Sequence, residues 1–198
     1  MAEPLLIGSA NQGKARELAQ LLEGLPWEVK SLGDMPQIEE PLEDGDTFEA
    51  NALKKAHYYS EHFGMACVAD DSGLIVDALD GAPGVYSARY SGPECDPEKN
   101  NAKLLAALED VPWHERTARF VCVAAFVGPG HEPHIENGTV EGHIAVACFG
   151  DKGFGYDPLF VAEGQECTFA EMDPVDKHEI SHRGEAFRKI GAYLESIV

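Results

Sequence analysis

Basic residues are scarce in this chain of 198 residues. Lys and Arg together number 15 against 35 Asp and Glu, which gives a formal net charge of −20 at pH 7. A field of that sign repels polyanions, so it argues against duplex DNA, RNA or an acidic membrane surface as a partner. A small phosphorylated molecule stays compatible with this charge if local Lys or Arg and a divalent cation meet its phosphates.

Long apolar runs and paired cysteines are also missing. The longest apolar run, Phe120 to Val127, has eight residues, whereas a membrane span needs about 20. Met1 to Pro4 lacks the basic start of a signal peptide. The five cysteines form no Cys-x-x-Cys pair. Three of them, Cys67, Cys122 and Cys148, lie in apolar runs, which is typical of buried residues in a reducing cytosol. We therefore expect a cytoplasmic protein.

Patterns typical of strands and of helices are mixed along the chain. Apolar runs predict strands at 5–7, 66–69, 74–76 and 120–127, and a weak alternation of apolar and polar residues predicts another at 27–32. Asn137-Gly138 predicts a hairpin turn within 135–140. Helices are predicted after the glycine loop at 8–14, from an Asp46 N-cap to Gly64, from Asp96 to Leu108 and at the C-terminus. The mixture favours one α/β or α+β domain, residues 1–198, built on a mixed sheet.

The segment Gly8 to Lys14, GSANQGK, lies between a predicted strand and a predicted helix. Backbone amides at a helix N-terminus, together with one ammonium group, can cradle a phosphate. The spacing matches the Gly-x-x-x-x-Gly-Lys loop of nucleotide hydrolases, but Ala15 lacks the hydroxyl that holds magnesium in that loop. The segment therefore indicates phosphate binding, with a glycine turn beside a solvated lysine as the alternative.

Two adjacent carboxylates, Asp70 and Asp71, follow the strand predicted at 66–69. Side chains alternate across a strand, so one carboxylate can face the protein interior while the other faces a site. A carboxylate beside bound phosphate is suited to hold magnesium or to act as the base for an attacking water. Taken alone, Asp70-Asp71-Ser72-Gly73 is more often an Asp turn.

Two later segments carry aromatic and basic side chains. Between Gly153 and Pro158, the rings of Phe154 and Tyr156 either stack on a nucleotide base or pack in the core. Lys177 and the segment Ser181 to Gly184 bring together Lys, His and Arg, whose donors can bind a carbonyl oxygen. Both segments are compatible with a site for a nucleotide base.

Together, six ordered motifs resemble the inosine triphosphate pyrophosphatase family, whose members remove noncanonical purine nucleoside triphosphates. The resemblance covers nearly the whole chain and is closest to the bacterial type. The motifs are Ser9-x-Asn11-x-x-Lys14, Glu43 ahead of Thr47-Phe48-x-x-Asn51-Ala52, Ala69 to Leu74, Gly81 to Tyr90, Gly153 to Pro158, and Ser181 to Gly184. Many members have Thr where Ser9 stands here, and Ser9 keeps the hydroxyl.

This resemblance implies an elongated α/β fold, with a central mixed sheet flanked by helices, two lobes and a cleft between them, and a homodimer. It implies hydrolysis of inosine, deoxyinosine or xanthosine triphosphate (ITP, dITP, XTP) between the α and β phosphorus atoms, which releases the monophosphate and pyrophosphate. The implied cofactor is Mg²⁺, and the implied partner is a small nucleoside triphosphate rather than a nucleic-acid polymer or a membrane.

The resemblance also implies the site residues. Asp71 resembles the general base and a metal ligand, with Glu43 as a second acidic residue of the metal site. The implied contacts to the triphosphate are Ser9, Ala10, Asn11, Gln12, Gly13, Lys14 and Lys55. Ser72, which follows the general base Asp71 in the sequence, is a further implied substrate contact. The implied contacts to the purine are Phe154, Gly155, Tyr156, Asp157, Lys177, His182 and Arg183. A donor from His182 or Arg183 would read the 6-oxo group of the purine.

Three rival functions are open at this point. A Maf-type nucleotide pyrophosphatase has a related fold, but its opening motif has arginines where Gln12-Gly13-Lys14 stands here. A P-loop phosphatase or kinase would release orthophosphate or ADP, and Ala15 argues against it. A nucleotide-binding module without turnover would need no carboxylate pair beside its phosphate loop.

Overall fold

The computed structural model describes residues 2–198. Contacts between residues divide the chain into two compact units. Unit 1 contains the residues up to Asp71 together with Cys122–Gly138 and Arg183–Val198, and unit 2 contains Ser72–Val121 and Thr139–His182. The assignment of residues 1–198 to one domain, and the elongated shape with a cleft, stay predictions.

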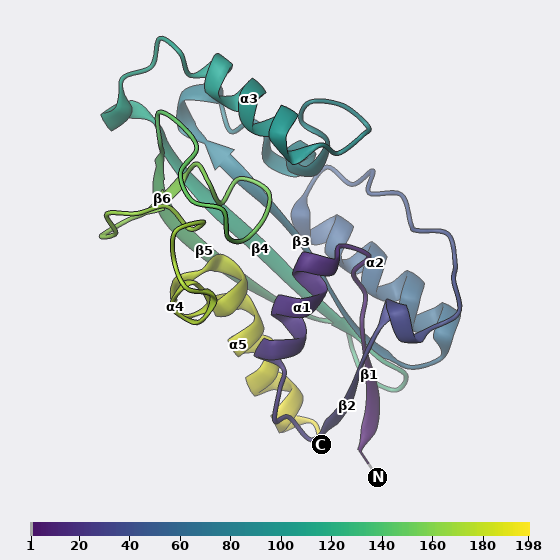
Figure 1. The fold of residues 1–198 in the computed structure, drawn as a ribbon. Helices are drawn as coiled ribbons and strands as arrows, with labels where there is room; N and C mark the ends of the chain where they lie inside the picture. Colours follow the sequence, from purple (N-terminus) through teal and green to yellow (C-terminus); the bar gives the residue numbers. More distant parts are fainter. Residues whose placement is uncertain (1) are drawn as a thin grey trace. The chain divides into compact units, whose positions relative to one another are not determined.

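The secondary structure confirms a mixed α/β fold, with helices flanking one sheet (Figure 1). The strands lie in the order β2-β1-β3-β4-β5-β6; β1 pairs in parallel with β2 and β3, and β5 pairs antiparallel with β6. The strands are β1 (Glu3–Ile7), β2 (Trp27–Ser31), β3 (Ala66–Val76), β4 (Thr117–Val127), β5 (His134–Ile144) and β6 (Phe160–Ala162). The α-helices are α1 (Gln12–Leu21), α2 (Phe48–Phe63), α3 (Pro97–Ala107), α4 (Pro174–Ile180) and α5 (His182–Ser196). The 3-10 helices are η1 (Leu32–Asp34), η2 (Asp77–Leu79), η3 (Gly84–Arg89) and η4 (Trp113–Glu115).

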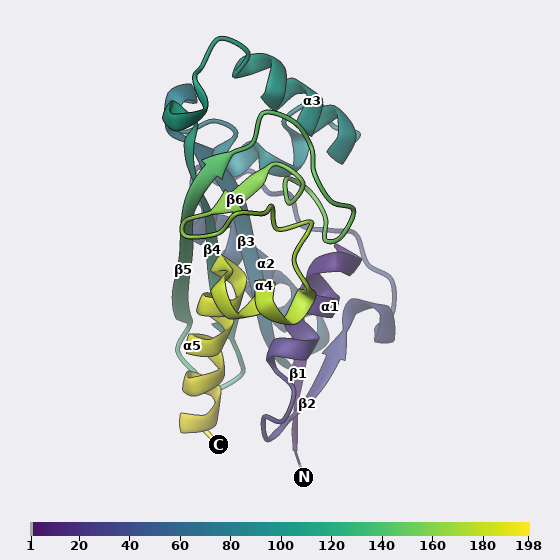
Figure 2. The same ribbon diagram turned by 60° about the vertical axis from the view of Figure 1, so that its left-hand side comes forward.

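In unit 1, helices cover both faces of the strands (Figures 1 and 2). Leu5 and Ile7 of β1 pack in one core cluster with apolar residues of α1 and α5. Leu6, which lies between them, packs instead with Tyr59 of α2. This alternation follows from the pleat of the strand, and it gives adjacent side chains of the central strands two different environments. No helix within residues 2–198 is both long and apolar enough to cross a membrane.

Two of the predicted helix starts can be compared with their caps. Asp96 caps α3 as predicted, because its side chain accepts hydrogen bonds from the amides of Glu98 and Lys99. The prediction of Asp46 as the N-cap of α2 is wrong by one residue. The cap is Thr47, whose hydroxyl oxygen accepts a hydrogen bond from the Ala50 amide at 3.1 Å. Its extended backbone puts that hydroxyl within reach of the first turn.

The two turns predicted inside strands are also wrong. The expected break at Asp70 to Gly73 does not occur, because β3 continues from Ala66 to Val76. Asn137-Gly138 lies inside β5, and the connection between β4 and β5 falls at 128–133, where Gly130 has a φ of +80°. Sheet pairing outweighs the local turn preference at both places.

Unit 2 has its own apolar core. Phe120, Phe160 and Phe169 are in mutual contact, with ring centroids 4.6, 5.1 and 6.1 Å apart. Tyr156 is part of this cluster. Cys148 does not lie in the core, contrary to the prediction, since it follows the end of β5 and is exposed; Cys67 and Cys122 are buried as predicted.

Candidate active site

The loop from Gly8 to Lys14 joins β1 to α1 in unit 1. A Cβ atom at Gly8 would lie 2.8 Å from both the Cys67 sulfur and the Tyr59 ring, so the chain can pass here only as glycine. The Asn11 side chain caps α1 by accepting from the amides of Gly13 and Lys14. The loop residues between Ser9 and Lys14 are exposed or half-buried. They therefore present a helix N-terminus to solvent, as a phosphate cradle requires.

The carboxylate of Asp70, in β3, forms ion pairs with basic side chains of α1 and α5. Its carboxylate is 3.1 Å from the Lys14 ammonium and 3.6 Å from Nε of Arg183. Arg183 also donates to Glu17 of α1 at 3.0 Å. Asp70 and Arg183 are 1% and 5% exposed. Asp70 therefore joins the phosphate loop to the start of α5.

The carboxylate of Asp71 contacts a different helix, α2. Nδ2 of Asn51 donates to its Oδ2 at 3.0 Å, and the Lys55 ammonium lies 3.7 Å from its Oδ1. The same ammonium donates to Glu43 at 2.6 Å, and Oδ1 of Asn51 accepts from the Gly45 amide at 2.8 Å. These contacts bring Glu43, Lys55 and Asp71 together and tie the acidic loop before α2 to this cluster.

The charges of this cluster set the proton affinities of its members. Burial is the largest influence on Asp71 and raises the pKa of its carboxyl, while Lys55 and Lys14 oppose that rise. Burial also acts to raise the pKa of Glu43, but the neighbouring Lys55 lowers it overall. For Lys55, the carboxylates of Asp70, Asp71 and Glu43 outweigh burial and raise the pKa. Glu43 and Lys55 are thus a stable ion pair, and Asp71 is the more basic carboxylate, which suits a proton acceptor.

The donor set also fits a divalent cation. Glu43 and Asp71 both approach one cation, the Lys55 ammonium, at 2.6 and 3.7 Å. Within residues 2–198, no group of three or more His, Cys, Asp or Glu is arranged to hold a metal ion. Mg²⁺ commonly takes one or two carboxylates and completes its shell with substrate phosphates and water. Two carboxylates beside a phosphate loop match that pattern.

The glycine-rich loop at 153–157 belongs to unit 2. Gly153 and Gly155 have φ values of +74° and +62°, a region that favours glycine. Asp157 accepts from the Phe154 amide and from the Lys177 ammonium, both at 2.8 Å. Phe154 is half-buried, with the Lys177 ammonium 5.2 Å from its ring centroid. This ring is therefore partly accessible and held at a fixed place.

Tyr156 and His182 are more deeply placed than Phe154. Tyr156 is 5% exposed and donates its hydroxyl to the Ser87 carbonyl at 2.8 Å, so only its backbone is suited to touch a ligand. His182, the first residue of α5, is 1% exposed and stacks on Phe120 with ring centroids 4.7 Å apart. Ser72, next to Asp71 in β3, is half-buried.

The residues predicted to bind the triphosphate and the metal and most of those predicted to bind the purine therefore belong to different units. The candidates for triphosphate and metal binding, from Ser9 to Asp71, lie in unit 1, and most base candidates lie in unit 2. Arg183 is the exception, because it pairs with Asp70 and Glu17 in unit 1. Asn51, which holds Asp71, was not predicted as a site residue. Two signals were present: Asn51 is part of the motif Thr47-Phe48-x-x-Asn51-Ala52, and it is a polar residue on the buried face of a predicted helix.

A mixed α/β fold, a phosphate-type loop at a helix N-terminus and a buried cluster of carboxylates and lysine define a candidate nucleotide-hydrolysing enzyme. The model of the Ham1 family matches residues 5–193, and the chain belongs to this family. The family resemblance drawn from the motifs is thereby confirmed.

Named relatives are similar over almost their whole length. The dITP/XTP pyrophosphatase of Geobacter sulfurreducens is 49% identical over 190 residues, which are 96% of each chain. The dITP/XTP pyrophosphatase of Desulforamulus reducens is 50% identical over 185 residues, which are 93% of this chain and 92% of that one. The solved structure of the Staphylococcus aureus Ham1 protein is 38% identical and superposes with a TM-score of 0.86, covering 98% of this chain and 99% of that chain.

Proposed function

We propose that this protein hydrolyses the noncanonical purine triphosphates dITP, XTP and ITP to the monophosphate and pyrophosphate. The observation that carries the proposal is the cluster of Asp71, Asn51, Lys55 and Glu43 in the same unit as the phosphate-type loop. The names of the relatives, dITP/XTP pyrophosphatase, support the substrate class and the reaction.

Asp71 is the proposed general base. It would take a proton from the water that attacks the α phosphorus, and Asn51 orients its carboxylate through the 3.0 Å hydrogen bond. Lys14, Lys55 and the amides of the glycine loop would stabilise the negative charge that grows on the departing pyrophosphate. Asp71 and Glu43 would hold Mg²⁺, which when bound supplies charge compensation on the phosphate oxygens.

Base recognition is assigned to the residues around the loop at 153–157. Phe154 would stack on the purine, with Lys177 and Asp157 fixing the loop, and a donor from His182 or Arg183 would bind the 6-oxo group. Adenine has an amino group at that position, which would leave a buried donor unpaired at a cost of about 1–3 kcal/mol. We place the activity in the cytoplasm, where nucleotide pools are used, and we expect the enzyme to act as a homodimer.

The rival functions are less well supported. The matched relatives are named dITP/XTP pyrophosphatase, which disfavours a Maf-type base preference and a P-loop phosphatase or kinase. A binding module without turnover would not explain a basic carboxylate held by Asn51 beside a phosphate loop.

A substrate panel tests the proposed function. We expect kcat/KM for dITP and XTP to exceed that for dATP by at least about tenfold, the worth of one unpaired buried donor. Equal rates for dITP and dATP would contradict the proposed base recognition.

Phe154→Ala is expected to weaken nucleotide binding by about 1–3 kcal/mol, the worth of one aromatic stack on a base. The loss should be similar for different purines, because stacking does not read the edge of the base. Titration calorimetry with the product monophosphates measures it. Unchanged binding together with a sharply lowered melting temperature would show that the ring serves only the core.

Arg183→Ala is expected to reduce kcat/KM for dITP at least about tenfold more than for dATP, because it removes a charged donor to the 6-oxo group. Steady-state kinetics with both substrates measures the ratio. An equal loss for both would instead assign the guanidinium to its observed partners, Asp70 and Glu17, and so to the alignment of the phosphate loop.

A further inference from the structure

Asn101 of α3 is a buried polar residue of unit 2 whose amide is only half paired. It is 7% exposed, and its Nδ2 donates to the Gly155 carbonyl at 3.0 Å. Its Oδ1 is buried and accepts no hydrogen bond within residues 2–198. A buried oxygen without a partner destabilises a folded protein, and an apolar side chain at this position would avoid that loss. Stability alone therefore does not explain an asparagine here.

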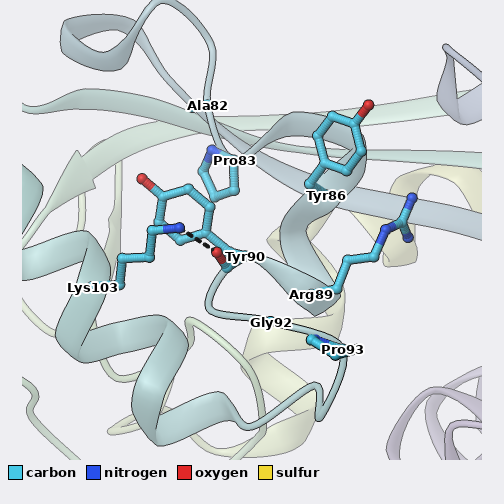
Figure 3. A pocket seen from close by; sticks show the side chains of 8 residues that line it. All are labelled: Ala82, Pro83, Tyr86, Arg89, Tyr90, Gly92, Pro93 and Lys103. Atoms are coloured by element: carbon cyan, nitrogen blue, oxygen red, sulfur yellow. Dashed lines mark hydrogen bonds between the residues drawn. The ribbon is translucent and has the colours of Figure 1, made fainter.

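The helix that carries Asn101 is fixed on the backbone next to it. The neighbouring Asn100 donates to the Ala88 carbonyl at 2.9 Å. One turn further along, Lys103 donates to the Tyr90 carbonyl at 2.6 Å, a bond drawn in Figure 3. A side chain on a helix fixed in this way can hold its own partner at a defined place.

The partner that Asn101 holds is the middle of the glycine-rich loop at 153–157. A Cβ atom at Gly153 would collide with the Asp157 carboxylate, so this glycine is packed against the loop itself. A Cβ atom at Gly155 would meet, apart from its chain neighbours, no atom of residues 2–198 within 4 Å. Space is therefore open beside Gly155, in the loop to which the proposed function assigns the purine.

The bond to the Gly155 carbonyl also sets the direction of the next amide. The peptide between Gly155 and Tyr156 is trans, so its N–H points opposite to its C=O. Because the carbonyl is bound by Asn101, the Tyr156 amide points away from α3, and it donates no hydrogen bond within residues 2–198. A donor that is already oriented loses less conformational entropy when a ligand binds to it.

We propose that Asn101 is a positioning residue for purine binding. It holds the Gly155 carbonyl on α3, so that the Phe154 ring and the Tyr156 amide are presented to the base in a fixed arrangement. The inference rests on the proposed function, which assigns the purine to this loop, and it adds a residue outside the loop. The chemical step is assigned to Asp71, which belongs to unit 1, so Asn101 acts on binding.

Steady-state kinetics with dITP tests this role. We expect Asn101→Leu and Asn101→Ala each to raise KM about three- to tenfold, the worth of one neutral hydrogen bond, with kcat within about twofold of the wild type. The dissociation constant of deoxyinosine monophosphate should rise by the same factor. Lys99→Ala, at an exposed position of the same helix, is the control and should change each constant by less than about twofold. A wild-type KM in both Asn101 variants would overturn the inference, and so would a loss confined to kcat.

Thermal unfolding separates this role from a structural one. Asn101→Leu removes the unpaired oxygen together with the donor, so its melting temperature should stay within about 4 °C of the wild type. Asn100→Leu should lower the melting temperature further, because it leaves both the Ala88 carbonyl and the Ser91 amide without their partner. If the two variants lose the same stability, Asn101 is structural and the inference is wrong.

Hydrogen exchange gives a second readout that needs no turnover. The amides of Phe154 and Asp157 are hydrogen-bonded within the loop, and they should exchange faster in Asn101→Leu than in the wild type or in Lys99→Ala. Unchanged exchange in a variant of an active enzyme would overturn the inference alone. Faster exchange in the variant, together with a wild type that does not turn over dITP, would overturn the hydrolase function alone.

Discussion

Asp71→Asn is expected to lower kcat for dITP at least about 100-fold while the protein stays folded and still binds nucleotide. Asn keeps the shape of the side chain but removes both the charge that would hold Mg²⁺ and the basicity that takes a proton from water. The raised pKa of Asp71, caused first by its burial, makes it the best proton acceptor of the cluster. Steady-state kinetics with a continuous assay for pyrophosphate measures the loss.

Asp44→Asn is a matched control, because it makes the same exchange in the acidic loop, at an exposed residue whose carboxylate pairs with Lys54. It should keep turnover near that of the wild type. Added Mg²⁺ should not restore the Asp71 variant, since the base is missing as well. If this variant keeps more than a tenth of the wild-type turnover, the role of base passes to Glu43 or Asp70.

Lys177→Met is expected to reduce the free energy of unfolding by about 3–5 kcal/mol, because it leaves the buried Asp157 carboxylate without its cation. The Lys177 and Asp157 side chains are 4% and 5% exposed, and their charged atoms lie 2.8 Å apart. Urea unfolding at pH 7 measures the loss. Lys152→Met is the control, since its partner Asp173 is exposed and such a pair is worth only about 0–1 kcal/mol.

A double variant separates stability from binding at this pair. Asp157→Asn in the Lys177→Met protein removes the buried charge, and Asn can still accept from the Phe154 amide. Most of the lost stability should return, whereas nucleotide binding should stay weak because the cation beside Phe154 is gone. A single-variant loss below about 1 kcal/mol would show that Asp157 is solvated or protonated in the folded protein.

The sequence predicted the elements whose signals are local. The run Leu5 to Ile7 and the glycine loop after it are β1 and the start of α1, and Asp96 is a true N-cap because its side chain reaches the first-turn amides. The alternation of Asp70 and Asp71 was also confirmed, since the two carboxylates meet different helices.

Other features depend on residues far away in the chain. Asp70 to Gly73 is typical of a turn, yet it is part of the paired strand β3, and Lys14, Arg183, Asn51 and Lys55 neutralise or bind its carboxylates there. The sequence left two roles possible for the Tyr156 ring, stacking on a base or packing in the core. The ring packs in the core, where its hydroxyl donates a hydrogen bond to the Ser87 carbonyl. Neither partner set could be read from the local sequence.

The most direct test of the proposed chemistry is product analysis of dITP hydrolysis with Mg²⁺ in water enriched in oxygen-18. We expect pyrophosphate and deoxyinosine monophosphate in equal amounts, with the heavy oxygen in the monophosphate, because water attacks the α phosphorus. Orthophosphate and deoxyinosine diphosphate would contradict it.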